Sequence, residues 1–199
     1  MGKETKQGFA ELAKQASLLP QEAMLEVGKK GKQLQIGIPK ENSFQENRVA
    51  ITPQATGLLV NNGHSVTIET GAGQNANFID NDYSEKGAQI AYTTEEVYMS
   101  DIVMKVEPPS LQEISLMQND KTLISAIQLS ILKKEYIDAL LKKKITAIAY
   151  EYIKDDAGTF AVIRSMGEIA GGTAILIAAE YLSNVSHRKG QLLGGVSGI

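Results

Sequence analysis

The chain has 199 residues, of which 43% are hydrophobic and 22% charged, and its formal net charge is -3 at pH 7. This composition is typical of a globular protein, and the acidic balance argues against the clustered basic face of a nucleic-acid-binding protein. Cysteine is absent, which excludes a disulfide framework, a thiolate nucleophile and a cysteine-based metal site.

The N-terminal residues lack the apolar stretch of a signal peptide, because charged residues interrupt them at Lys3, Glu4, Lys6 and Glu11. No run approaches the roughly 18 consecutive apolar residues that indicate a membrane span. We therefore expect a cytoplasmic protein with no membrane-spanning segment and no nucleic-acid partner.

Residues 1–33 differ in pattern from the rest of the chain. Apolar residues recur at helical spacing up to Leu19, Pro20 interrupts them, and residues 28–32 form a Gly/Lys linker. Two interpretations stay open for this N-terminal helical arm. It forms short amphipathic helices that pack on the main body or on a partner subunit, or it is partly disordered.

From Leu34 onward, short β-rich runs alternate with helical stretches. The expected strands are residues 34–38, 65–69, 102–106, 122–126 and 145–149. The expected helices are residues 53–62, 94–99, 111–117 and 133–143, the first of them capped by Thr52 and stopped at Asn62-Gly63. This alternation predicts an α/β domain over residues 34–165, Rossmann-like or flavodoxin-like, with a parallel sheet and helices on both faces.

After this domain the pattern changes. Residues 166–182 are apolar on nearly all sides, which predicts a buried helix that could connect two domains. Residues 191–199, QLLGGVSGI, are typical of a strand and a Gly-rich turn. We interpret residues 166–199 as an interdomain helix and the start of a further domain, and we expect the chain to be truncated in mid-architecture.

One glycine motif imitates a dinucleotide site. Residues 71–76, GAGQNA, match G-x-G-x-x-A, follow a predicted strand, and have Glu95 at about the required distance. The fingerprint needs a helix that opens at the glycines and holds the pyrophosphate, whereas Asn77, Asp80 and their polar neighbours break any helical face. We favour a structural turn over a cofactor site.

His64 and His187 lack catalytic or metal-binding neighbours in the sequence and are expected to be surface or capping residues.

Two basic residues are candidates for a binding site. Arg48 lies in a polar loop between the first strand and the first helix, at the sheet edge where α/β proteins bind ligands. It suits capture of a carboxylate or phosphate, or it simply pairs with Glu46 or Glu41. Lys105 ends another strand and could polarise a carbonyl or hold a carboxylate, but it needs a partner, of which Glu107 is the nearest in sequence.

Several segments recur, in order, in a known family. They are IGIPKE (36–41), ENRVAITP (46–53), NNGHSVTIETGAG (61–73), DIVMKVEPP (101–109), MGEIAG (166–171) and GGVSGI (194–199). From Leu34 to the last residue, the chain resembles the N-terminal region of alanine dehydrogenases and of the alpha subunit of NAD(P) transhydrogenases. In this family the GAG turn belongs to the first domain and not to the nucleotide site.

The resemblance implies two Rossmann-like domains with a cleft between them, and NAD or NADP bound by the second, which this chain lacks. It implies a homo-oligomer acting on an amino acid or 2-oxo acid, or working with a second nicotinamide nucleotide domain. Arg48 matches the arginine that binds the substrate carboxylate, and Lys105 matches the first lysine of the KV motif. Glu107 replaces a second, substrate-contacting lysine, and Gln128 replaces the catalytic histidine.

These departures leave the reaction open among three interpretations. The first is an alanine dehydrogenase, in which the acid/base group comes from elsewhere, Lys105 itself being a candidate, because glutamine cannot act as a general acid or base. The second is transhydrogenase-like hydride transfer between NADH and NADP. The third is a stand-alone binding domain without catalysis. The 199-residue chain alone is expected to show no turnover.

Overall fold

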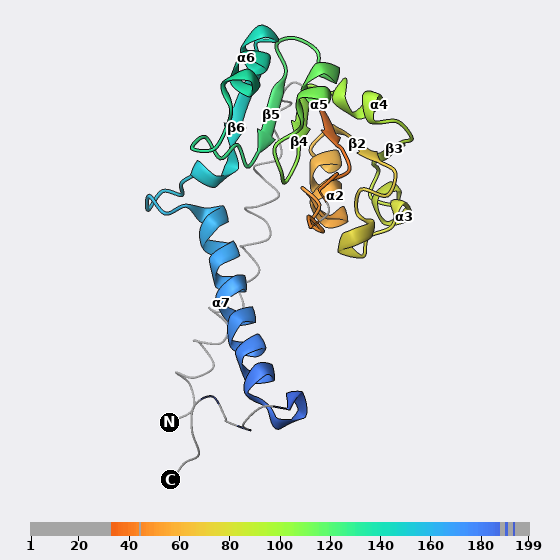
Figure 1. The fold of residues 1–199 in the computed structure, drawn as a ribbon. Coiled ribbons are helices and arrows are strands. Elements are labelled where there is room, and N and C mark those ends of the chain that lie inside the picture. The colour runs from red at the N-terminus through yellow and green to blue at the C-terminus, as the bar shows by residue number, and fades with distance from the viewer. Residues whose placement is uncertain (1–32, 44, 188–189, 191–192, 194–199) are drawn as a thin grey trace, which may run out of the picture.

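Six strands form one parallel sheet in the order β3-β2-β1-β4-β5-β6 (Figure 1). The structure is a computed structural model that describes residues 33–43, 45–187, 190 and 193. The strands are β1 (Gln35–Ile38), β2 (Ser65–Glu69), β3 (Gln89–Ala91), β4 (Ile102–Met104), β5 (Thr122–Ser125) and β6 (Thr146–Ala149). The predicted arm and the predicted strand and turn over residues 191–199 lie almost entirely outside the described residues.

Helices connect these strands in chain order. The α-helices are α2 (Pro53–Asn61), α3 (Asp80–Ser84), α4 (Thr94–Tyr98), α5 (Leu111–Leu116), α6 (Lys134–Lys142) and α7 (Ala161–Leu182). Short 3-10 turns are η2 (Gln74–Ala76), η3 (Tyr150–Tyr152) and η4 (Asn184–Ser186). The predicted parallel α/β fold is therefore confirmed, and its strand order is the Rossmann one rather than the flavodoxin one.

The core consists of two apolar clusters, one on each face of the sheet. The first joins Val103 and Leu123 of β4 and β5 to side chains of α4, α5 and α6, including Tyr98 and Leu140. The second joins residues of β1 and β2 to Tyr83 of α3 and to partly buried residues of α2. Helices on both faces follow from the alternation of side chains along each strand, which gives every central strand two apolar faces to cover.

The predicted ends of α2 are confirmed. The Thr52 side chain accepts a hydrogen bond from the Ala55 backbone N–H at 3.3 Å, and Pro53 occupies the first turn. At the other end, Gly63 adopts a φ of 88°, which favours glycine and allows the chain to turn into β2. The Leu34 N–H donates to His64 Nδ1 at 3.4 Å, so this histidine helps to fasten the turn to β1.

The sequence pattern missed two short elements. β3 has only three residues, and α3 forms over a stretch whose polar residues were expected to prevent a helix. α3 forms because the Asp82 carboxylate accepts the Ile79 backbone N–H at 2.8 Å, and because Tyr83 is fully buried below the helix. Polar residues favour the first turn of a helix even where they weaken its interior.

Gly37 in β1 lies where the sheet passes closest to α4. A Cβ atom there would lie 2.3 Å from the Val97 carbonyl oxygen and 2.7 Å from Ser100 Oγ. We expect Gly37→Ala to lower the free energy of unfolding by about 3 kcal/mol or more, because backbone would have to shift. Urea denaturation tests this against Gly57→Ala in α2, where the new methyl meets only the Lys86 side chain at 3.5 Å. The control is expected to be neutral or stabilising, and equal losses in both variants would contradict the packing argument.

α7 contradicts the prediction of a buried helix. It projects from the domain beyond β6 (Figure 1), and none of its residues is buried. Its apolar pattern predicted burial, which the described residues do not provide. With 22 residues and a mean hydropathy of 1.4 over an 18-residue window, α7 is also long and apolar enough to cross a membrane by length and composition alone. We did not expect such a segment, although these two criteria are also met by core helices.

Candidate functional site

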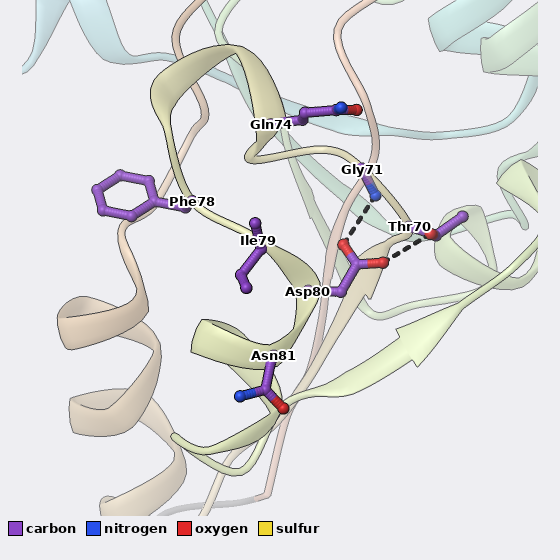
Figure 2. Close-up of a pocket in the computed structure, with 7 residues that line it drawn as sticks. All are labelled: Thr70, Gly71, Gln74, Phe78, Ile79, Asp80 and Asn81. Carbon is purple, nitrogen blue, oxygen red and sulfur yellow. Dashed lines mark hydrogen bonds between the residues drawn. The ribbon is translucent and has the colours of Figure 1, made fainter.

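The GAG turn is not built to hold a dinucleotide. One Asp80 carboxylate oxygen accepts the Gly71 backbone N–H at 2.8 Å, and the other accepts the Thr70 hydroxyl at 2.7 Å (Figure 2). η2 follows the glycines as a single turn, so no helix N-terminus faces them. A carboxylate therefore occupies the donors that a pyrophosphate would need, and these residues do not fit a nicotinamide cofactor.

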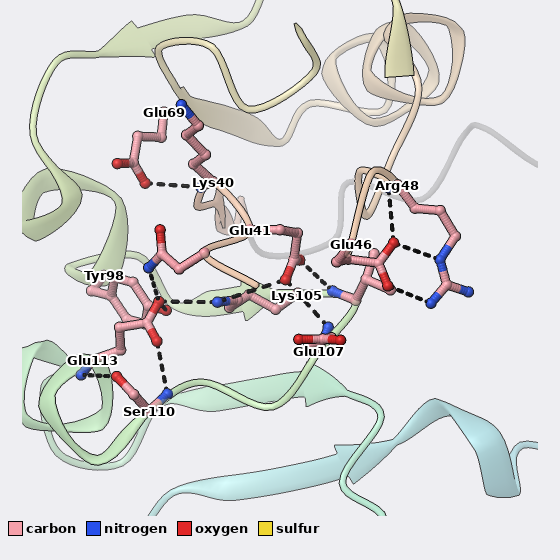
Figure 3. A network of polar contacts seen from close by, with 12 residues as sticks. Lys40, Glu41, Glu46, Arg48, Glu69, Tyr98, Lys105, Glu107, Ser110 and Glu113 are labelled. Carbon is pink, nitrogen blue, oxygen red and sulfur yellow. Dashed lines mark hydrogen bonds and ion pairs between the residues drawn. The ribbon is translucent and has the colours of Figure 1, made fainter. Parts of the chain in front are cut away.

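The topological switch point of the sheet lies between β1 and β4. The chain proceeds from β1 towards β2 on one side and from β4 towards β5 on the other, and α/β sheets bind ligands outside the strand ends at such a point. The segment after β1 carries Glu41, Glu46 and Arg48, and the segment after β4 carries Lys105 and Glu107 (Figure 3). The structure thus brings together the two basic candidates from the sequence.

Arg48 is held by Glu46 through two parallel hydrogen bonds. Its Nε donates to Glu46 Oε1 at 2.7 Å, and its Nη2 donates to Glu46 Oε2 at 2.6 Å. The Glu46 side chain is 7% exposed, whereas that of Arg48 is 50% exposed. The hydrogen bond from Arg48 lowers the pKa of the Glu46 carboxyl and in turn raises the pKa of Arg48. The pairing with Glu46 was one of the two interpretations for this arginine, and it leaves part of the guanidinium exposed.

An apolar cavity of about 450 Å³ adjoins the Arg48 side chain. Its lining residues come from the loop after β1, from β4 and the segment after it, from β5, from η3 and the residue after it, and from α7. They are Arg48, Val49, Ala50, Met104, Lys105, Val106, Ile124, Tyr150, Ile153, Val162 and Met166. The Tyr150 hydroxyl donates to the Val106 carbonyl at 2.9 Å, and burial raises the pKa of this phenol. A site of this kind suits a small ligand with one anionic end and an apolar body.

Lys105 lines the cavity, but its ammonium belongs to a buried polar network. Nζ donates to Glu113 Oε1 at 3.0 Å and lies 3.7 Å from Glu41 Oε2, and the side chain is 3% exposed. The Tyr98 hydroxyl donates to the same Glu113 oxygen at 2.9 Å. The partner that a buried lysine requires is therefore supplied by Glu113 and Glu41, and the neighbouring Glu107 is not that partner.

The pKa values of the two network carboxyl groups shift in opposite directions. Burial raises the pKa of the Glu41 carboxyl, and the Val106 N–H bond and the Lys105 charge offset only part of this rise. Burial also raises the pKa of Glu113, but hydrogen bonds from Ser110 and Lys105 outweigh it, so that pKa lies below its usual value. Glu113 is thus the network carboxyl group in which hydrogen bonds outweigh the effect of burial on the pKa.

Glu41 also connects the two strands that flank the switch point. Its Oε1 accepts the Val106 N–H at 2.6 Å, and its Oε2 accepts the Glu107 N–H at 3.3 Å. The backbone that carries Glu107 is thereby fixed to the end of β1. The Glu107 side chain is not among the cavity-lining residues, although its charge is close enough to act on Arg48.

Gln128 follows β5 and lies apart from this cavity. It is exposed, adopts a φ of 46°, and donates its backbone N–H to Glu151 Oε1 at 2.7 Å. Glu151 Oε2 also accepts the Ile127 N–H at 3.3 Å. The structure therefore does not bring Gln128 together with Arg48 and Lys105. In the described part of the chain, no group of three or more acidic or histidine side chains could hold a metal ion.

Sequence reasoning missed Tyr150, Glu113 and Glu151 as parts of this region. Glu113 could have been suspected from Ser110-x-x-Glu113, a capping box whose glutamate accepts the Ser110 N–H at 2.7 Å. Tyr150 and Glu151 lie within the segment AYEYI at residues 149–153. No local signal indicated that they approach the strand ends.

Comparisons with known proteins agree with this architecture. Residues 37–170 match the family model described as alanine dehydrogenase/PNT, N-terminal domain. The alanine dehydrogenase of Methanococcus maripaludis is 39% identical over 165 residues, which cover 82% of this chain and 44% of the relative. That of Bacillus subtilis is 38% identical over 164 residues, covering 82% of this chain and 43% of the relative.

Solved structures give the same result. A structure of L-alanine dehydrogenase matches with a TM-score of 0.75 and 36% identity, over 83% of this chain and 46% of that one. The transhydrogenase from Sinorhizobium meliloti matches with a TM-score of 0.57 and 29% identity, over 60% of this chain and 35% of that one. The chain spans less than half the length of the curated relatives that it matches. It belongs to the alanine dehydrogenase/PNT family and carries that family's N-terminal domain.

Proposed function

We propose that this chain is the substrate-binding part of an NAD(P)-linked oxidoreductase of the alanine dehydrogenase type. The reaction would be the reversible oxidative deamination of L-alanine to pyruvate and ammonia. The nicotinamide would accept the hydride, and it would be bound outside the described residues, since the GAG turn does not fit it. We further propose a cytoplasmic homo-oligomer that acts on a small molecule.

One observation carries this proposal: an arginine with a partly exposed guanidinium stands beside a small apolar cavity at the switch point. Arg48 would bind the substrate carboxylate, because a guanidinium matches a carboxylate with two parallel hydrogen bonds. The cavity beside it would receive the methyl group, where Val49 and Ile124 are among the apolar residues. The apolar lining and the adjacent guanidinium both suit alanine or pyruvate.

Proton transfer would need a group other than Gln128, since a side-chain amide does not titrate. Lys105 remains a candidate, and it would act only after it leaves Glu113, to which it is hydrogen bonded. We favour a positioning role for Lys105 in the described arrangement. Glu107 would influence substrate binding through its charge, because its backbone is held by Glu41 and its side chain does not line the cavity.

The charges around the cavity predict a preference for substrates with one carboxylate. Arg48 and Lys105 are the basic residues among those that line it, and each is already paired with a glutamate. A second carboxylate would be desolvated without a cation, so kcat/KM for pyruvate should exceed that for 2-oxoglutarate by roughly two orders of magnitude. Steady-state kinetics with both acids measure this ratio. Similar values for the two acids would contradict the proposed site.

The reaction itself is tested with the intact protein. We expect NADH or NADPH to form only when L-alanine is present, as followed by absorbance. Hydride exchange between NADH and an oxidised NADP analogue without any amino acid would instead support transhydrogenation. That second candidate is favoured by Gln128 and Glu107, which stand where dehydrogenases of this family have a histidine and a lysine. If neither reaction occurs, a binding domain without catalysis becomes the better account.

A further inference from the structure

We infer that Glu46 is a positioning residue that determines which edge of the Arg48 guanidinium meets the substrate carboxylate. The inference rests on the proposed function, because it takes Arg48 as the carboxylate-binding group. It concerns a residue two positions before Arg48, whose effect on the substrate would be indirect. Glu46 itself is not among the residues that line the cavity.

A guanidinium has two edges that can each hold a carboxylate through two hydrogen bonds: the Nε/Nη2 edge and the Nη1/Nη2 edge. Glu46 occupies the first, with distances of 2.7 and 2.6 Å (Figure 3). Nη1 lies on the other edge, where its contact among the described residues is Met166 Sδ at 3.4 Å. Met166 lines the cavity together with Arg48 and also a second hollow along α7, and we assign the Nη1/Nη2 edge to the substrate because Glu46 leaves that edge without a carboxylate.

The pair is also anchored on the side of Glu46. The Glu46 side chain is buried, whereas the Arg48 side chain is half exposed. Glu46 is therefore the partner held by the protein, and Arg48 is the partner that a ligand can reach. In addition, the Arg48 backbone N–H donates to Glu46 Oε1 at 2.8 Å. One carboxylate therefore fixes both the backbone and the head group of Arg48. A long side chain held in this way loses less freedom when it binds a ligand.

Positioning and simple electrostatics predict opposite results for Glu46→Gln. If Glu46 acted only through its charge, its neutralisation would leave the Arg48 charge uncompensated and would strengthen carboxylate binding. If Glu46 holds the guanidinium, the amide breaks the paired hydrogen bonds, since its NH2 group faces the arginine donors. The guanidinium then samples other orientations, and carboxylate binding weakens.

The experiment measures kcat and KM for pyruvate with the intact wild-type protein, Glu46→Gln, and Glu95→Gln as control. Glu95 is an exposed residue of α4, so its substitution removes the same charge without touching the site. We expect KM to rise about tenfold in Glu46→Gln while kcat changes less than threefold, because the lost interaction acts on bound substrate and transition state alike. An unchanged or lower KM would overturn the inference.

Two further measurements separate the possible failures. Arg48→Lys keeps the charge but loses the paired N–H donors of the guanidinium, and it should raise KM. A normal KM in that variant would overturn the proposed function and not only the role of Glu46. Nitrogen-15 NMR of the arginine Nε–H groups tests the hydrogen bond between Arg48 and Glu46 without measuring turnover. The Arg48 signal, assigned by its loss in Arg48→Lys, should exchange slowly with water in wild type and fast in Glu46→Gln.

A rapidly exchanging Arg48 signal in wild type would overturn the inference, whatever the kinetics show. Should Glu46→Gln prevent folding, Glu46→Asp keeps the charge and shortens the side chain by one methylene. The same rise in KM is then expected, because the shorter carboxylate cannot reach both Nε and Nη2. A wild-type KM in Glu46→Asp would show that charge alone suffices and would contradict positioning.

Discussion

Replacing Arg48 with alanine should lower kcat/KM for pyruvate about a hundredfold in the intact protein. The expected loss corresponds to two hydrogen bonds between charged groups, which the truncated side chain can no longer make to the substrate carboxylate. Kinetics at pyruvate concentrations well below and well above KM would give both parameters. The effect should fall mainly on KM if Arg48 binds the ground state as strongly as the transition state.

The matched control for this variant is Arg164→Ala. Arg164 is an arginine of α7 that is 65% exposed and paired with Glu168, four residues further along the same helix. Such a surface pair contributes little to stability, and Arg164 does not line the cavity. Its loss should leave kcat/KM within about twofold. Equal kcat/KM values for the Arg48 and Arg164 variants would remove Arg48 from the substrate site.

Lys105→Met should have the largest effect on stability, lowering the free energy of unfolding by about 3–5 kcal/mol. The substitution leaves Glu113 and Glu41 without their cation inside the protein, where an unpaired carboxylate is costly. Urea denaturation at neutral pH measures the loss. Lys121→Met is the control, because the Lys121 pair with Asp101 is partly exposed, at 19% and 36%. It should cost about 1 kcal/mol or less.

The pH dependence of Lys105→Met gives an independent check on the network. Burial already raises the pKa of Glu41 in the folded state, and removal of the Lys105 charge raises it further. A carboxyl group with a raised folded pKa destabilises the fold most when it is ionised, and it is relieved by protonation as pH falls. The difference in unfolding free energy between wild type and variant should therefore shrink towards acidic pH. A difference independent of pH would point to lost packing and not to charge.

The sheet could be predicted from the sequence because apolar residues recur with different periods in strands and in helices. Each of the expected strands appears within two residues of its predicted ends, and Thr52 caps α2 as predicted. β3 was not predicted because three residues are too few to show the alternation of apolar and polar residues that marks a strand. α3 was not predicted because its stability comes from Asp82 at its start and from the burial of Tyr83, and not from a repeating apolar face.

The sequence predicted that Arg48 and Lys105 lie at the same sheet edge, but it did not predict the residues to which they are paired. Arg48 and Lys105 were assigned to strand ends, and parallel topology brings such ends to one edge. The partners of Lys105 lie elsewhere in the chain: Glu113 is on α5, and Glu41 follows β1. Such pairings depend on how a helix folds back over the sheet, which local patterns do not encode. Gln128 was grouped with Arg48 by family resemblance, whereas the cavity beside Arg48 does not include it.

The α7 error has a different origin. Its uniform apolarity was interpreted as burial, whereas none of its residues is buried in the structure. An apolar pattern reports the environment of a helix in the whole protein or assembly, and it does not say which part supplies that environment.

The measurement that tests the central claim most directly is a crystal structure of the intact protein with bound pyruvate. We predict that the pyruvate carboxylate lies within hydrogen-bond distance of Nη1 and Nη2 of Arg48, with its methyl group in the cavity beside Ile124. Glu46 should still occupy the Nε/Nη2 edge. Pyruvate bound away from Arg48, or an Arg48 side chain that leaves Glu46 to bind it, would contradict the account.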